Sequence, residues 1–274
     1  MQSLLRVKDL NVNYRGGDSS EHHAVSDVNF EIGEGEVLGL MGESGCGKTS
    51  IALALLGLLA KNQAQVQGSV QFRGEELLSA DKSTLRRIRG AEISLVFQEA
   101  EIALSPAIKV RDQVAEVIHA HRDWKWKQCR MEAESALVRV GFPGSQRAFS
   151  AYPHQLSGGQ RQRVILAQAL ACKPVLLIAD EPAASLDPRS QNELLTLLRE
   201  LQRELKLSVL LISHSPEAQA RLADRLMVMA NGRIVEQGRF DQLFRKPSHE
   251  CTRAMLRANF AADVGKNRDF EMVT

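Results

Sequence analysis

The chain has 274 residues, which is enough for one large domain or two small ones. Hydrophobic residues make up 44% and charged residues 25%, and the net charge of +2 provides no global attraction to nucleic acid or anionic lipid. The sequence has no long apolar run that would span a bilayer, and its N-terminus lacks the pattern of a secretory signal. Its four cysteines are scattered, so we expect free thiols in a reducing cytosol.

Two alternating segments, Leu4 to Tyr14 and Ala24 to Ile32, predict strands that flank a loop at residues 15–20. Because both precede a glycine-rich motif at residues 42–49, we expect a small antiparallel β-region that leans on a nucleotide-binding core. Tyr14, at the end of the first strand, has two interpretations. Its ring could stack on an adenine, or it could pack locally.

Residues 42–49 have the spacing G-x-x-x-x-G-K-[ST] of a phosphate-binding loop, between an apolar strand at 37–41 and a predicted helix from Ser50 to Leu59. Glycines let the backbone turn its N–H groups inward, and the helix start adds to this anion site. Lys48 can reach the β- and γ-phosphates, and Thr49 can place its hydroxyl on Mg²⁺. The predicted nucleotide contacts here are Gly42, Glu43, Ser44, Gly45, Cys46, Gly47, Lys48, Thr49 and Ser50.

Beyond this loop, Val66 to Arg73 and Glu92 to Phe97 predict strands, and Lys82 to Arg89 predicts a short basic helix. Gln98 ends the second strand at the edge where ligands bind in open α/β sheets. Its amide could touch Mg²⁺ or the attacking water, or it could simply be a polar strand cap.

A region of about fifty residues, which includes Val110 to His121 and Cys129 to Val140, predicts helices without strands and therefore a separate lobe. Within it, residues 123–127 alternate acidic or basic residues with two tryptophans. A nucleic-acid interface is one interpretation, but a single short cluster in a near-neutral chain supplies few phosphate contacts. A solvated helix face or a protein contact is the favoured interpretation.

The stretch Leu156-Ser157-Gly158-Gly159-Gln160 predicts the start of a helix that reaches about Ala171, with Ser157 as its N-cap. Its glycines leave backbone amides accessible, which makes a second anion-binding helix start in one chain. Because a phosphate-binding loop already satisfies its own nucleotide, this second site is best explained by a nucleotide that another subunit holds.

The apolar run from Val175 ends in Asp180 and Glu181, which predicts a buried strand with two acids at its carboxyl end. Asp180 would hold Mg²⁺, and Glu181 could polarise water in line with the γ-phosphate. A turn at residues 182–188 then leads into a helix that begins near Arg189. A further buried strand, at 208–212, precedes His214, which could donate to a γ-phosphate oxygen, although a lone histidine can also be structural.

The C-terminal part begins with two strands, Arg225 to Ala230 and Gly232 to Gln237, around a hairpin signal at Asn231-Gly232. We expect amphipathic helix from there to Phe260 and a mobile tail from Ala261 to Thr274.

In this order, the motifs resemble the nucleotide-binding subunit of an ABC transporter, and LSGGQ is the stretch that separates these proteins from other P-loop proteins. Further stretches resemble the oligopeptide, dipeptide and nickel importer group. They are residues 39–45, 152–156 and 177–182, and residues 247–254 resemble that group less closely. The resemblance implies an α/β fold with three parts: a P-loop NTPase core with a mainly parallel sheet, an N-terminal antiparallel β-subdomain and a helical subdomain. It implies one ABC ATPase domain at 1–260, with the helical subdomain at about 99–172, and a flexible tail at 261–274.

The resemblance also implies a head-to-tail dimer in which each ATP, with Mg²⁺, lies between one subunit's phosphate-binding loop and the other's LSGGQ. Its implied partners are two membrane-spanning permease subunits, a second ATPase subunit (a different chain or a second copy) and a separate solute-binding protein, with no nucleic acid. The implied location is the cytoplasmic face of the inner membrane, and the implied cargo is peptides, nickel or a similar chelated solute.

By the same resemblance, each candidate residue has a role. The implied roles are adenine stacking for Tyr14, γ-phosphate sensing for His214, catalysis for Glu181, His214 and Gln98, Mg²⁺ binding for Thr49, Gln98 and Asp180, and contact with a facing subunit's nucleotide for Leu156, Ser157, Gly158, Gly159, Gln160 and Asp187.

The sequence departs from the group's pattern at two places, and the first of them, at residues 99–100, affects partner choice rather than hydrolysis because the resemblance implies that it faces the membrane subunit. Glu99-Ala100 stands where Asp-Pro is usual, and Ser215 stands where Asp is usual. Two other functions stay open. One is a soluble ABC ATPase of DNA repair or translation, although such chains usually carry a second cassette or a coiled-coil insertion. The other is a regulatory protein that binds nucleotide without turnover, although the candidate catalytic residue Glu181 argues against it. Cys46 is expected to have a favoured, reactive thiolate because it lies near a helix start, or else to be an inert small residue.

Overall fold

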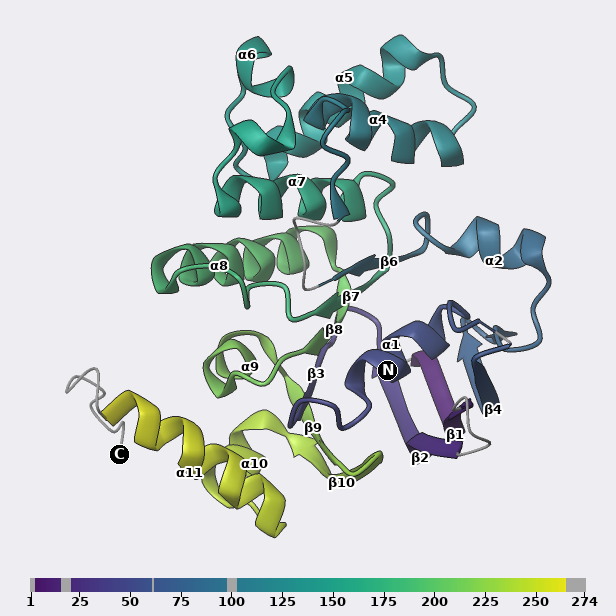
Figure 1. Ribbon diagram of the computed structural model, residues 1–274, viewed down its shortest axis with the longest axis vertical. Helices are drawn as coiled ribbons and strands as arrows, with labels where there is room; N and C mark the ends of the chain where they lie inside the picture. Colours follow the sequence, from purple (N-terminus) through teal and green to yellow (C-terminus); the bar gives the residue numbers. More distant parts are fainter. Residues whose placement is uncertain (1–2, 16–20, 61, 98–102, 265–274) are drawn as a thin grey trace.

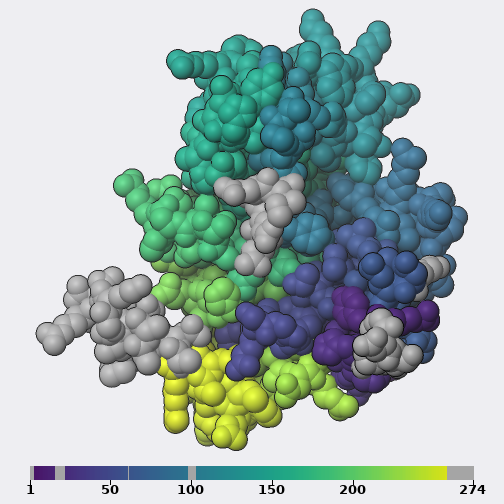
Figure 2. All heavy atoms as spheres, viewed as in Figure 1, coloured from purple at the N-terminus to yellow at the C-terminus, as the bar shows by residue number. Residues whose placement is uncertain are grey.

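The computed structural model describes residues 3–15, 21–60, 62–97 and 103–264, with the side chains of 21 and 258–264 left aside. Its two sheets meet around a shared core, and a helical lobe projects from one end of the larger sheet (Figures 1 and 2). The α/β fold class with an antiparallel β-subdomain and a helical subdomain is therefore confirmed.

The larger sheet has six strands in the order β10-β9-β3-β8-β7-β6. Five of them run parallel, and β10 pairs antiparallel with β9. Their bounds are β3 (Val37–Gly42), β6 (Ile93–Val96), β7 (Leu176–Asp180), β8 (Ser208–Ile212), β9 (Arg225–Ala230) and β10 (Arg233–Arg239). Strands β3, β7 and β8 are buried along their whole length, which is why their sequences are continuous apolar runs rather than alternating ones.

The register of the parallel strands aligns three functional segments. Leu40 of β3 lies opposite Ile212 of β8, and Ile212 lies opposite Asp180 of β7. The three strands therefore end at nearly the same level, and the loops that follow them emerge at one edge of the sheet.

The smaller sheet is antiparallel, in the order β2-β1-β4-β5, and packs against helix α1 (Lys48–Leu55). Its strands are β1 (Ser3–Arg15), β2 (Glu21–Gly33), β4 (Ala64–Phe72) and the two-residue β5 (Glu75–Glu76). The core residues of β1, β2 and β4 form one apolar cluster with α1 and one face of the larger sheet. The β-subdomain is thus fixed to the nucleotide-binding core by a continuous hydrophobic contact.

The helical lobe lies between β6 and β7, as the strand-free region predicted. It contains α4 (Val110–His121), α5 (Trp126–Arg139), α6 (Gln146–Phe149), a 3-10 turn (Pro153–Gln155) and α7 (Gly158–Leu170). Trp126 packs against the lobe's core, and the Arg122 guanidinium lies over the Trp124 ring, 5.8 Å from its centroid. Only Trp126 lies on a helix; Trp124 is exposed in the connection between α4 and α5, so the cluster does not form one helix face.

Some of the expected helix boundaries were wrong. Helix α1 begins at Lys48 rather than Ser50, and it ends at Leu55 because Gly57 adopts a positive φ of 58°. The C-terminal helix is interrupted at residues 246–249, which include Pro247, and it forms α10 (Phe240–Arg245) and α11 (Glu250–Val264). Helix α11 therefore continues four residues past the expected start of the tail.

The remaining helices are α2 (Lys82–Ile88), α8 (Pro188–Leu205) and α9 (Pro216–Leu222). Across the described ranges, none of the helices has both the length and the apolar character needed to cross a bilayer.

The central strand β8 gives a direct test of this core. Leu210 is fully buried, so Leu210→Ala should lower the free energy of unfolding by about 3 kcal/mol, since both apolar contact and volume are lost. Urea denaturation followed by circular dichroism measures the loss. Val138→Ala is the control because Val138 is 51% exposed, and it should change stability by less than about 0.5 kcal/mol. Equal losses for the two variants would contradict this packing.

Candidate functional site

The phosphate-binding loop connects β3 to α1 and is shaped by two glycines with positive φ, Gly45 at 80° and Gly47 at 109°. At Gly47, a Cβ atom would also lie 2.2 Å from the carbonyl oxygen of Ala24, so any other residue would be strained and crowded. Gly47 caps α1 without a side-chain hydrogen bond. The amide groups at the helix start are therefore not covered by a capping side chain and are available to an anion.

Lys48 folds back over this loop. Its Nζ donates to the carbonyl oxygens of Gly42 and Glu43, both at 2.8 Å, and the residue is only 8% exposed. These hydrogen bonds keep a buried ammonium solvated by the protein until an anion is present.

Thr49 and Asp180 are brought together from positions 131 residues apart. The Thr49 hydroxyl donates to Asp180 Oδ2 at 2.7 Å. Burial raises the pKa of Asp180 above its usual value, the Thr49 hydrogen bond lowers it, and the neighbouring charge of Glu181 raises it. A hydroxyl and a carboxylate are hard oxygen ligands of the kind that Mg²⁺ prefers, so the donor set fits this ion.

Glu181 begins the turn after β7 and adopts a φ of 49°, which is uncommon for a residue with a side chain. Its backbone N–H donates to Ile212 at 2.9 Å, which ties the turn to β8. Its carboxylate accepts from three groups on the facing turn: the His214 backbone N–H at 2.8 Å, His214 Nδ1 at 2.6 Å and Ser213 Oγ at 3.1 Å. Both carboxylate oxygens are thereby fixed.

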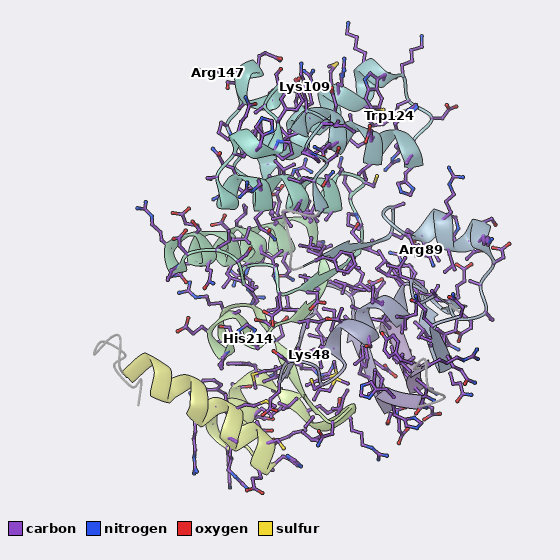
Figure 3. All side chains as sticks on the ribbon, viewed as in Figure 1. Lys48, Arg89, Lys109, Trp124, Arg147 and His214 are labelled. Atoms are coloured by element: carbon purple, nitrogen blue, oxygen red, sulfur yellow. The ribbon has the colours of Figure 1, made fainter. Side chains whose placement is uncertain are left out.

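His214 and Lys48 both lie at the loop edge of the large sheet, far from Trp124 in the helical lobe (Figure 3). The His214 side chain is 60% exposed although Glu181 beside it is buried, so the ring keeps a face open to a ligand. Sequence analysis missed Ser213, which is buried and whose hydroxyl also accepts from the Ser215 backbone N–H at 3.2 Å. A serine directly before a candidate histidine at a strand end was the available signal.

Tyr14 lies near the start of α1, where its hydroxyl is 3.1 Å from Ser50 Oγ, and its ring packs partly against the core of the β-subdomain. This is the local packing interpretation, and the hydrogen bond also fixes the ring next to the phosphate-binding loop. Gln98, with Glu99 and Ala100, lies outside the described residues.

The LSGGQ stretch forms the start of α7 with a reciprocal cap. Ser157 Oγ accepts from the Gln160 N–H at 3.3 Å, and the Ser157 N–H donates to Gln160 Oε1 at 3.0 Å. Ser157 is exposed, and Leu156, Gly158 and Gly159 are half-buried. The end of α7 that carries Ser157 is therefore accessible from outside the subunit.

The beginning of α8 borders the same surface. A Cβ on Gly158 would contact Leu186, and one on Gly159 would contact Ser190, so both glycines face the turn into α8. Asp187 caps α8 by accepting from the N–H groups of Arg189 and Ser190, and hydrogen bonds from Ser190 hold the pKa of Asp187 below its usual value. The structure thus brings Asp187 and LSGGQ together.

The two anion-binding helix starts stand on different parts of the molecule. Helix α1 packs against β1, β2, β3 and β7, whereas α7 packs against α4, α5, α8 and β6. Figure 1 shows α1 beside the small sheet and α7 at the base of the helical lobe. The sequence motifs thus form two clusters, not one pocket.

The expectation of a favoured thiolate at Cys46 was wrong. Burial raises the pKa of the Cys46 thiol, and this outweighs the nearby Lys48 charge, whose Nζ is 3.9 Å from Sγ. The inert small residue is the interpretation that the geometry supports.

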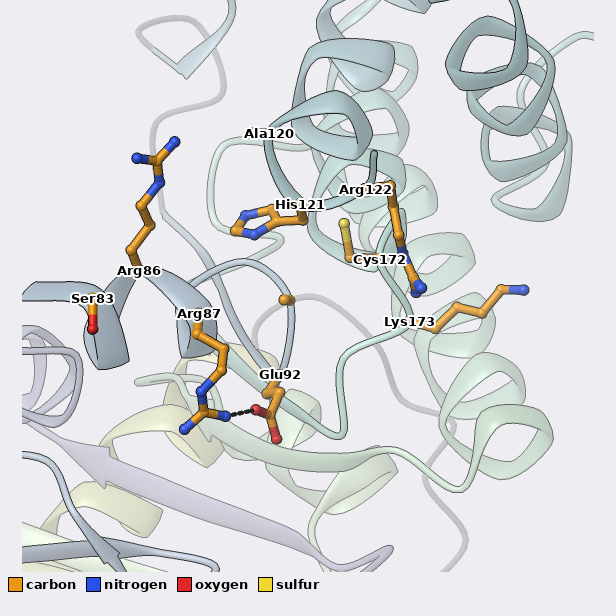
Figure 4. Close-up of a pocket in the computed structure, with 10 residues that line it drawn as sticks. Ser83, Arg86, Arg87, Glu92, Ala120, His121, Arg122, Cys172 and Lys173 are labelled. Atoms are coloured by element: carbon orange, nitrogen blue, oxygen red, sulfur yellow. Dashed lines mark hydrogen bonds and ion pairs between the residues drawn. The ribbon is translucent and has the colours of Figure 1, made fainter. Parts of the chain in front are cut away.

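A separate cleft of about 610 Å³ lies between α2 and the end of α4 (Figure 4). Arg86, Arg87, His121, Arg122 and Lys173 make it strongly basic, and Glu92 is the one acid that lines it, held by Arg87 at 2.6 Å. Burial lowers the pKa of His121, and the charges of Arg86 and Arg122 lower it further. The cleft is lined by none of the nucleotide loops described above, so its chemistry is separate from theirs.

The profile of the ABC transporter family matches residues 25–184, which is more than half of the chain. The chain belongs to the ABC transporter family. The ATP-binding protein OppD of Haemophilus influenzae, named for oligopeptide transport, is 40% identical over 258 residues, which are 94% of this chain and 79% of OppD. A glutathione import ATP-binding protein of Shigella boydii is 39% identical over 262 residues, 93% of this chain and 42% of that protein.

Solved structures agree with this assignment. A dimeric ATP-binding cassette in a post-hydrolysis state with ADP and phosphate has a TM-score of 0.76 at 26% identity, covering 86% of this chain and 98% of that one. A cassette of a Clostridium perfringens ABC transporter complex has a TM-score of 0.75 at 27% identity, covering 96% of this chain and all of the other. The ABC ATPase fold is thus shown.

The raised pKa of Asp180 has a testable consequence for stability. Because the folded-state pKa lies above its unfolded value, ionised Asp180 destabilises the fold at neutral pH. This cost begins to shrink as the pH falls through the folded-state pKa, and it is lost below the unfolded value. Asp180→Asn should therefore raise the thermal midpoint at pH 7.5, and the gain should shrink on acidification. Differential scanning fluorimetry from pH 7.5 down towards the ordinary carboxyl pKa of about 3.9 measures it; a midpoint that falls at pH 7.5 would contradict this account.

Proposed function

We propose that this chain is the ATP-hydrolysing subunit of an importer, in which ATP lies between the phosphate-binding loop of one subunit and the LSGGQ of a facing one. The observation that carries this proposal is the separation of the two anion-binding helix starts, α1 and α7, onto different elements, with Ser157 exposed. One nucleotide can engage both only when a second subunit supplies the other helix start.

Within each site, the backbone amides of residues 42–49 and Lys48 bind the phosphates. Thr49 and Asp180 hold Mg²⁺, which neutralises phosphate charge when it is bound. Glu181 accepts a proton from the attacking water, and His214 donates to the γ-phosphate. Ser157, Gly158 and Gly159 contact the γ-phosphate of the facing subunit's ATP, supported by Leu156 and Gln160.

The remaining residues complete the proposal. Tyr14 stacks on adenine, Asp187 contacts the neighbouring site, and Gln98 links Mg²⁺ to the membrane partner. Lys48, Asp180 and Glu181 would then exchange their contacts with other groups of the protein for contacts with nucleotide and metal.

The names of the relatives support peptides as the cargo, with nickel or a similar chelated solute as the second choice. The partners proposed with this role are two membrane-spanning permease subunits, a second ATPase subunit, either a different chain or a second copy, and a separate solute-binding protein. The chain would then act at the cytoplasmic face of the inner membrane without crossing it. The family relatives speak against a soluble ATPase of DNA repair or translation.

Glu181→Gln tests the chemistry. Because glutamine keeps the shape but accepts no proton, ATP turnover should fall at least about 100-fold while ATP binding persists. Steady-state phosphate release and fluorescent-nucleotide titration measure the two, and size-exclusion chromatography should show an ATP-dependent dimer. Glu193→Gln is the control, because Glu193 is exposed on α8 and forms ion pairs with Arg163 and Arg189. Unchanged turnover in Glu181→Gln would refute the assigned role.

Transport by the complete complex in proteoliposomes tests the cargo. A peptide-loaded receptor should stimulate ATP hydrolysis, and a nickel-loaded receptor should not. Stimulation by nickel alone would replace the peptide assignment with the metal one.

A further inference from the structure

Gln219 is a buried polar residue that the site described above does not use. It lies on the short helix α9, which follows the turn that carries His214, and its exposure is 0%. Its side-chain Nε2 lies 3.2 Å from the carbonyl oxygen of Ser213, 3.3 Å from that of Leu211 and 3.4 Å from that of Leu40. An amide nitrogen has two hydrogens, so these three acceptors share one donor group.

The three carbonyl groups belong to the segments that end at the functional loops. Leu40 lies two residues before Gly42, the first residue of the phosphate-binding loop, and it is paired with Ile212 across the sheet. Leu211 and Ser213 flank the end of β8 directly before His214. One side chain therefore joins the strand that leads to the phosphate-binding loop and the turn that holds Glu181.

Gln219 fits because residue 39 is glycine. A Cβ on Gly39 would lie 2.1 Å from Gln219 Oε1 and 3.0 Å from Leu226 Cδ1. Gln219 Oε1 itself accepts no hydrogen bond from the described residues. A buried acceptor without a donor destabilises the fold, so stability alone does not explain why a glutamine stands here. The hydrogen bonds that its amide nitrogen donates to the three carbonyl groups offer another explanation.

We propose that Gln219 is a positioning residue for ATP hydrolysis. Its amide fixes the turn at residues 213–215 against β3, so that the Ser213 hydroxyl and His214 hold both oxygens of the Glu181 carboxylate. The inference rests on the proposed roles of Glu181 and His214. It adds that one buried amide reinforces the alignment of this pair with the phosphate-binding loop, beside the Ser213 backbone N–H, which donates to the same Leu40 carbonyl oxygen at 3.1 Å.

Gln219→Leu in the full-length chain removes the donor and keeps the side chain apolar and similar in size. The turnover number for Mg·ATP should fall about tenfold or more, because a displaced Glu181 loses its alignment with water. The KM for ATP should stay within about twofold, since the phosphate contacts of residues 42–49 are not touched. Wild-type turnover in a folded Gln219→Leu protein would overturn the proposal.

Gln202 offers a matched control. It is also a buried glutamine, on helix α8, and its Nε2 donates to the Gly35 carbonyl oxygen at 2.8 Å. Gly35 lies just before β3 begins, so this contact is at the opposite end of the strands from the functional loops. Gln202→Leu likewise removes a buried side-chain donor, and its turnover number should be unchanged; the thermal midpoints of both variants are measured beside their turnover numbers. An equal loss of turnover in both variants would mean that general destabilisation explains the effect, and the proposal would fail.

The pair Gly39–Gln219 separates packing from positioning even where Gln219→Leu folds poorly. Gly39→Ala alone should be strongly destabilised, because its Cβ meets the glutamine oxygen. The double variant Gly39→Ala/Gln219→Ala removes this clash and leaves only the flexible end of Leu226 to adjust. It should recover the thermal midpoint while its turnover number stays low; recovery of both would show that Gln219 acts only through packing.

These outcomes are distinct from a failure of the proposed function. If the wild-type chain hydrolyses no ATP, alone or with its membrane partners, the proposed function itself is wrong. If the wild type hydrolyses ATP and Gln219→Leu matches it, only the positioning role is wrong.

Discussion

The parallel register of β3, β8 and β7 is the constraint on which the site depends. Leu40, Ile212 and Asp180 form one row across the sheet, so the phosphate-binding loop, the His214 turn and the two acids all emerge together. Backbone hydrogen bonds set this alignment with the accuracy of a sheet ladder, and the strands are buried on both faces. A shift of one strand by one residue would move Asp180 away from Thr49 and Glu181 away from His214.

That edge of the sheet concentrates charged groups that hydrogen-bond to other groups of the protein. Lys48 uses two backbone carbonyls, Asp180 uses the Thr49 hydroxyl, and Glu181 uses Ser213 and His214. Each charge is buried and hydrogen-bonded, which lowers the cost of keeping it out of water. The same groups can exchange these partners for phosphate, metal and water. Their side chains are therefore already in position, and hydrogen bonds that can be replaced hold them there.

Two features support the proposal that two subunits share each nucleotide. The amides at the start of α1 stand beside the small sheet, and those at the start of α7 stand at the base of the helical lobe, next to Asp187. Ser157 caps α7 through reciprocal hydrogen bonds with Gln160 and is exposed, so the start of α7 is ordered without a partner. Preorganisation of this kind lowers the ordering cost of association.

The sequence by itself determined the motifs that are recognised by the spacing of residues along the chain. The glycine, lysine and threonine positions of the phosphate-binding loop, the LSGGQ cap and the acids after an apolar run were all visible as patterns, as were most strands and helices. The tertiary structure decided what burial and distance control: the raised pKa of Cys46, the contact of Ser213 with Glu181 across 32 residues, and the packing of Gln219 against Gly39 across 180 positions. A sequence pattern records the order of residues along the chain, whereas solvent exclusion and contacts between distant segments exist only once the strands have paired.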